Sequence, residues 1–206
     1  MTGVLGGLDL APIAIAISLV AAAIAIVHHA SLRSDAERAE AGWILDVVLA
    51  LHAAVYVWVT LGVHASPGTL TPNLIPFTEL GATFEYWFTS WIPEHGLTQV
   101  PPQVAVVAGN FLLLAPFATV APLRWKALTS GWRVIVATAV IAGVDELLQG
   151  VLGRGRNLSF DDVLVQVLGA IAIYGMMTGA LNARERRLAD AHEDAKTAAQ
   201  SSPNAP

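Results

Sequence analysis

The sequence predicts an all-α membrane protein, a polytopic transmembrane bundle of about five helices with one amphipathic helix in the interface. Apolar residues make up 55% and charged residues 13% of the 206 residues, and the mean hydropathy is +0.59. This composition leaves too little polar surface to cover a water-soluble domain. Apolar stretches near the roughly 20 residues that cross a bilayer recur along the chain. We therefore expect one helical bundle.

Five apolar stretches are the predicted transmembrane helices. They cover residues 10–27, 43–64, 104–123, 134–152 and 163–181. No basic residue precedes the first stretch, as a secretory signal would require, so we expect this helix to be retained. Pro116 is predicted to kink the third helix, because proline removes a backbone donor. Gly169 and Gly175 lie in the fifth, where small residues let helices approach closely.

The long segment between the second and third stretches predicts an amphipathic helix. Its aromatic and aliphatic residues recur every three or four positions, at Phe77, Leu80, Phe84, Phe88 and Trp91. This spacing puts them on one helical face, with polar residues on the other. We expect a helix from Phe77 to Ile92 that lies in the membrane interface, because it is too polar to span the bilayer.

The chain divides into a membrane domain and a tail. The membrane domain is predicted to cover residues 1–183. Residues 184–206 begin with arginines and become rich in Ala, Asp and Ser, with Pro near the end. This composition predicts a disordered cytoplasmic tail.

The basic residues predict the topology. With the N-terminus outside, nine Lys and Arg residues fall on the inner side and only Arg154 and Arg156 on the outer side. Since cytoplasmic loops are enriched in Lys and Arg, we expect an extracytoplasmic N-terminus and a cytoplasmic C-terminus. The two outer arginines oppose this rule, which indicates that something other than topology selects them.

Polar residues converge at the outer rim of the predicted bundle. The helix directions bring them to one depth, and they are Asn110, Asp145, Glu146, Gln149, Arg154, Arg156, Asp161, Asp162 and Gln166. An ionisable group at membrane depth costs about 2.5 to 3.5 kcal/mol, so such groups are normally paired or face a wet cavity. We expect Glu146 to pair with Arg156. The arginines could bind a phosphate while a carboxylate orients a ligand or accepts a proton.

Structural roles compete with these functional ones. Ser159 and Asp162 have the spacing of a capping box, and acids are favoured in a first helical turn, so capping explains Asp161 and Asp162 at least as well as catalysis does. Asn110 and Gln149 are equally well explained as hydrogen bonds between helices. A structural bridge between Glu146 and Arg156 is the strongest alternative to a site.

Composition excludes several functions. A formal charge of −5 and the absence of a basic stripe argue against a nucleic-acid partner. The sequence has no cysteine, which excludes thiolate chemistry, and its six histidines show no ligand spacing. We therefore predict no metal and no cofactor. The sequence does not determine the oligomeric state.

Several motifs together resemble the VanZ-like family of bacterial membrane proteins, over residues 73–174. They are Asn73-Leu74-Ile75-Pro76-Phe77, Asn110 with Pro116-Phe117, Glu146-Leu147-Leu148-Gln149, Arg156, and Asp161-Asp162 with Gly169-Ala170. Three positions depart from the family pattern, namely Ala118, Ala142-Gly143 and Gln166. The resemblance implies a cell-envelope role, because the family is named after a protein associated with resistance to teicoplanin.

Three functions follow as hypotheses. The first is binding of an anionic, lipid-linked envelope component, with Arg154 and Arg156 on its phosphate and Asp145 or Glu146 positioning its head. The second is an enzyme that acts on such a lipid, with Glu146 and Asp145 as the candidate catalytic residues. The third is a transporter, which is disfavoured because the acids cluster at one rim.

Overall fold

The computed structural model confirms a bundle of membrane-spanning helices. It describes residues 10–32, 34–62, 73–96, 99–152 and 158–201. In these ranges five helical stretches are long and apolar enough to cross a membrane, at Ala11–Ser31, Asp35–Leu61, Pro102–Arg124, Gly131–Val151 and Phe160–Ala198. They correspond one to one with the five predicted stretches. The second predicted stretch ends at residue 64, outside the described residues.

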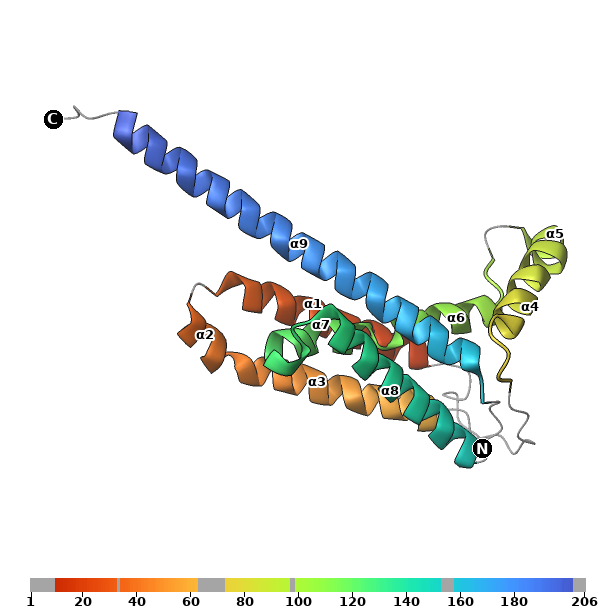
Figure 1. The fold of residues 1–206 in the computed structure, drawn as a ribbon. Helices are drawn as coiled ribbons and strands as arrows, with labels where there is room; N and C mark the ends of the chain where they lie inside the picture. Colours follow the sequence, from red (N-terminus) through yellow and green to blue (C-terminus); the bar gives the residue numbers. More distant parts are fainter. Residues whose placement is uncertain (1–9, 33, 63–72, 97–98, 153–157, 202–206) are drawn as a thin grey trace, which may run out of the picture.

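Figure 1 shows the helices in their order along the chain. Their bounds are α1 Ala11–Ser31, α2 Asp35–Glu40, α3 Gly42–Val57, the π-helix η1 Trp58–Gly62, α4 Thr78–Tyr86, the π-helix η2 Trp87–Trp91, α5 Ile92–His95, α6 Pro102–Leu113, α7 Ala115–Arg124, the 3₁₀-helix η3 Lys126–Leu128, α8 Gly131–Val151 and α9 Phe160–Ser201. Ser34 begins α2 with a capping box to Glu37, which fixes the reversal between α1 and α3.

The third span is kinked, as Pro116 predicted. The α-helix breaks at Leu114, whose φ and ψ are −97° and 5°, and α7 begins at the next residue. Proline in the first turn of α7 costs no hydrogen bond, whereas in a continuous helix it would remove one. The third span is therefore two helices, α6 and α7, with different directions.

α9 is the central packing partner of the other helices. It packs against α6, α7 and α8, and α3 packs against α1 and α7. A Cβ added at Gly169 in α9 would lie 1.7 Å from the carbonyl oxygen of Phe111 in α6. The close approach of α6 and α9 thus requires glycine at this position. It also brings the first turns of α9 beside Asn110.

An ion pair joins two helices at the opposite end from the start of α9. Arg124, the last residue of α7, donates to both carboxylate oxygens of Asp46 in α3 at 2.7 and 3.0 Å. No pattern in the sequence predicted this pairing. The bidentate geometry fixes α7 against α3.

The predicted amphipathic segment is helical. It forms α4, η2 and α5 in succession, and Figure 1 shows it beside the start of α9, apart from the long helices. Phe77, Phe84 and Phe88 of its apolar stripe are exposed. An exposed aromatic face is what a helix lying in a membrane interface needs.

The predicted disordered tail is wrong for residues 184–201. α9 continues without a break through Ser201, so it has 42 residues and extends beyond the bundle (Figure 1). No Gly or Pro occurs between Gly179 and Pro203, and the stretch is rich in Ala, Arg and Glu, which favour helix. Helix propensity therefore outweighs the high polarity on which the prediction was based. Residues 202–206 lie outside the described part.

Candidate functional site

Polar side chains from several elements meet where α8 ends and α9 begins. We call this set the acidic network, and its members are Tyr56, Glu79, Asn110, Asp145, Glu146, Gln149, Ser159, Asp161, Asp162 and Gln166. They come from α3, α4, α6, α8 and α9 and the residue before α9. The structure thus brings together every predicted site residue that it describes.

Asp161 anchors α4 to the start of α9. Its carboxylate accepts hydrogen bonds from the backbone N–H groups of Phe77, Glu79 and Leu80, the latter two at 2.8 and 3.1 Å. Phe77 adopts the left-handed conformation, with φ of 65°. This conformation is sterically unfavourable for a bulky residue. The hydrogen bonds from the three N–H groups to Asp161 therefore indicate that tertiary contacts impose it. Asp161 therefore caps a helix, but the helix is α4 and not its own.

A short backbone pairing supports the same junction. The N–H of Asn73 donates to the carbonyl of Leu158 at 2.8 Å, and the N–H of Phe160 donates to the carbonyl of Asn73 at 3.0 Å. These bonds form a parallel bridge between Asn73 and Ser159. The segment that begins with Asn73 is thereby fixed along the residues that precede α9, which places Glu79 beside Ser159.

Ser159 joins two carboxylates. Its backbone N–H donates to Oε2 of Glu146 at 3.1 Å, and its hydroxyl donates to Oε2 of Glu79 at 2.8 Å. Ser159 is 3% exposed and Glu146 is 4% exposed. A buried carboxylate is costly unless hydrogen-bond donors surround it, so the Ser159 N–H stabilises the buried Glu146, while its hydroxyl binds the partly exposed Glu79.

The other acids of the network have partners of their own. Oδ2 of Asp145 accepts from the side-chain amide of Gln149 at 2.7 Å, one turn along α8. Oδ1 of Asp162 accepts from the side-chain amide of Asn110 at 2.7 Å, which joins α9 to α6. Asp145 and Glu146 therefore have different partners, as expected for adjacent residues about a hundred degrees apart on a helix.

Tyr56 links α3 to the network. Its hydroxyl donates to Oε1 of Gln166 at 3.2 Å and also lies within hydrogen-bonding reach of the Asp145 side chain. Gln166 is 1% exposed, so it is one of the most buried polar side chains described. Tyr56 lies two residues before the π-helix η1, and such helical irregularities often accompany functional sites.

Sequence reasoning missed Tyr56 and Glu79, and assigned Ser159 only a capping role. Glu79 lay on the polar face of an amphipathic helix, where a solvated acid is the ordinary expectation. A tyrosine within an apolar span gave no signal either. The Asn73-Leu74-Ile75-Pro76-Phe77 motif was the useful signal, because it lies immediately before the N–H groups that bind Asp161.

Two predicted site residues cannot be placed. Arg154 and Arg156 belong to residues 153–157, which lie outside the described part of the chain. The expected pairing of Glu146 with Arg156 therefore stays a prediction. In sequence, these residues lie between two members of the acidic network, Gln149 and Ser159.

The chemistry available at this end is that of hydrogen-bond acceptors. Five carboxylates come from three helices. Side-chain amide and hydroxyl donors contact Glu79, Asp145 and Asp162, and backbone N–H groups contact Glu146 and Asp161. Such groups can position a ligand's hydroxyl, amide or ammonium groups, or exchange a proton. In the described ranges, no group of three or more His, Asp or Glu side chains has the geometry to hold a metal ion.

The comparisons with known proteins identify one family. The model of the family described as VanZ/LLP1 matches residues 47–181. The comparison with curated proteins and that with solved structures gave no match. The matched region contains the whole acidic network and the segments on either side of it, while α1 lies outside it.

Proposed function

Because the chain belongs to the VanZ/LLP1 family, we propose that it binds the head of an anionic, lipid-linked envelope component at the acidic network. The observation that carries this proposal is the burial of acidic and amide side chains from separate helices at one end of a membrane bundle. Asp145, Glu146 and Asp161 are each at most 4% exposed. Ionisable groups in such positions are costly and typically mark a ligand or ion pathway.

The charges suggest how the ligand's groups are divided among the residues. A phosphate would be repelled by the five carboxylates, so it needs the basic residues that adjoin the network. Arg154 and Arg156 are in the short connection between α8 and α9, and arginine binds phosphate through two parallel hydrogen bonds. Asp145 and Glu146 would then accept hydrogen bonds from the polar head beyond the phosphate.

We propose that this end of the bundle faces away from the cytoplasm. Three basic residues lie at the opposite end, namely Arg124 at the end of α7, Lys126 in the connection to α8, and Arg133 in the first turn of α8. Lys and Arg are enriched in cytoplasmic loops, which supports this orientation. An envelope lipid exposed on the outer leaflet would then reach the network directly. A role in resistance to teicoplanin-type glycopeptides is a further part of the proposal and rests on the family alone.

Native mass spectrometry of the purified protein with extracted envelope lipids tests this proposal. We expect the unmodified protein to retain one class of phosphorylated lipid and Arg156→Ala to lose it. Arg186→Ala is the matched control, because Arg186 is an exposed arginine of α9 that is not a member of the acidic network. Equal, nonselective lipid binding by all three proteins would contradict the proposal.

The same preparation distinguishes binding from catalysis. Glu146→Gln keeps an acceptor for the N–H of Ser159 but cannot act as a general acid or base. Chemical conversion of the bound lipid that disappears in Glu146→Gln would make the protein an enzyme. Retained lipid with no conversion in either protein would make binding the whole function.

A further inference from the structure

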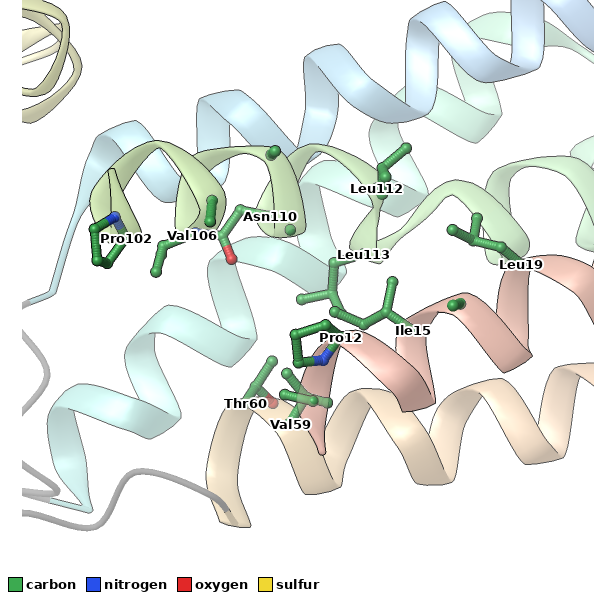
Figure 2. Close-up of a pocket in the computed structure, with 15 residues that line it drawn as sticks. Pro12, Ile15, Leu19, Val59, Thr60, Pro102, Val106, Asn110, Leu112 and Leu113 are labelled. Carbon is green, nitrogen blue, oxygen red and sulfur yellow. The ribbon is translucent and has the colours of Figure 1, made fainter. Parts of the chain in front are cut away.

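An apolar cavity lies next to the acidic network, between α1, η1 and α6 (Figure 2). Its volume is about 460 Å³, within the range of small-molecule pockets. Ile15 and Leu113 point toward each other across the space between α1 and α6 and pack in one apolar cluster. None of the residues that line it is charged. The cavity therefore suits a hydrocarbon and not a polar ligand.

Small residues create this space and leave it open at the side. Ala16 of α1 and Ala105, Ala108 and Gly109 of α6 are among the lining residues. Ala16, Ala105 and Ala108 are themselves exposed, and Val106 is 53% exposed. Because α1 and α6 both belong to membrane-spanning stretches, an opening between them faces the hydrocarbon of the bilayer.

Asn110 connects the cavity to the acidic network. It lines the cavity, and its side-chain amide donates to Asp162 at 2.7 Å. The second polar side chain in the lining is Thr60. Its hydroxyl donates to the carbonyl of Tyr56 at 2.9 Å, so its hydrogen cannot be donated to a ligand as well. A molecule that fills the cavity would thus have an apolar environment along its length and the acidic network at one end.

We infer that this cavity holds the hydrocarbon chain of a lipid whose phosphorylated head lies at the acidic network. The inference rests on the proposed function and adds a chain site to it. A hydrocarbon chain matches the lining, which has no charged residue, and the opening between two membrane-spanning stretches, which faces the hydrocarbon of the bilayer.

The cavity has one wall that lies outside the family region. Residues 47–181 match the family and include η1 and α6, whereas α1 ends at Ser31. Ile15, Ala16 and Leu19 of α1 complete the cavity. The head-binding network is therefore built from family residues, while α1 sets the width of the chain site in this protein.

Lipid binding by the full-length protein in nanodiscs tests the inference. Three probes are compared. Farnesyl phosphate carries an isoprenoid chain with a phosphate, oleoyl lysophosphatidic acid an acyl chain with a phosphate, and farnesol an isoprenoid chain without one. Ala16→Phe and Ala105→Phe fill the cavity from opposite walls. Ala23→Phe is the matched control, because Ala23 is an exposed alanine of α1 that does not line the cavity.

We expect both cavity-filling variants to bind at least one phosphorylated probe tenfold or more weakly than the unmodified protein, with Ala23→Phe unchanged. The phosphorylated probe whose binding is lost shows whether the cavity holds an isoprenoid chain or an acyl chain. Binding by both variants equal to that of the unmodified protein would overturn the inference, as would an unmodified protein that binds none of the probes. The unmodified protein could bind farnesol and farnesyl phosphate equally, with both lost in the cavity-filling variants. That result would support the chain site and contradict the phosphate site.

A second measurement does not depend on the folding of a variant. The unmodified protein should bind farnesyl phosphate at least tenfold more tightly than isopentenyl phosphate, after correction for partition into protein-free discs, because the longer chain buries more apolar surface in the cavity. Equal corrected affinities would overturn the inference.

Discussion

The carboxylate of Asp161 accepts a 2.8 Å hydrogen bond from the backbone N–H of Glu79, although 82 residues separate them in the chain. The contact fixes the start of α4 at the start of α9. It also holds the Glu79 side chain where the hydroxyl of Ser159 can reach it, at 2.8 Å. Together with the backbone bridge between Asn73 and Ser159, this carboxylate fixes the position of the amphipathic segment and part of the acidic network.

Replacing Asp161 should release α4. Asp161→Ala removes the acceptor of three backbone N–H groups, and loss of a helix cap with charged hydrogen bonds costs about 2 kcal/mol. Hydrogen exchange of the amides of Glu79 and Leu80 should accelerate by more than tenfold. Asp190→Ala, in the exposed part of α9, should leave these amides unchanged. Unchanged exchange in Asp161→Ala would show that other contacts hold α4.

The close approach of α6 and α9 gives a second prediction. In Gly169→Ala the new methyl would lie 1.7 Å from the carbonyl oxygen of Phe111, so backbone must move, at a cost of about 3 kcal/mol or more. Thermal unfolding in detergent should begin at a clearly lower temperature. Gly175→Ala, on the same helix with no atom within 4 Å, should be neutral or stabilising. Equal melting temperatures for the two variants would contradict the packing.

The hydrogen bond between Asn110 and Asp162 gives a third. A double-mutant cycle with Asn110→Ala and Asp162→Ala should show a coupling of about 1 kcal/mol, in the range of hydrogen bonds between membrane helices and of those to charged groups. Reversible unfolding in mixed micelles measures this coupling. Additive effects of the two substitutions would indicate that the contact contributes no net stability.

The fold was predictable because hydropathy and helix direction depend on local sequence. Apolar stretches located all five spans, and Pro116 located the break at Leu114. Alternating directions then placed Asn110, Glu146 and Asp162 at one end. Each membrane-spanning helix can run only inward or outward. The sequence was therefore enough to predict that these residues lie at the same depth, without knowledge of their contacts.

The individual partners were not predictable, because they depend on how helices rotate and approach. Asp161 and Asp162 are adjacent in sequence, yet one caps α4 and the other bonds Asn110 in α6. Tyr56 reaches Gln166 across 110 residues. Such contacts are set by close packing, including that at Gly169, and no spacing in the sequence encodes them.

The proposed topology gives a fourth prediction. The chain has no cysteine, so single cysteines can be introduced without removing any. A membrane-impermeant maleimide should label Glu94→Cys in intact cells and Glu40→Cys only after the membrane is opened, since both positions are exposed and lie on opposite sides in the proposal. The reverse pattern would place the acidic network on the cytoplasmic side and contradict the proposed orientation.

The preference of the purified protein for farnesyl phosphate over farnesol tests the central claim most directly. The two probes share a chain, so their affinity ratio isolates recognition of the phosphate. We predict a preference of about tenfold or more, equivalent to 1.4 kcal/mol, that is lost in Arg156→Ala and kept in Arg186→Ala. No preference in the unmodified protein, or an undiminished preference in Arg156→Ala, would contradict the account.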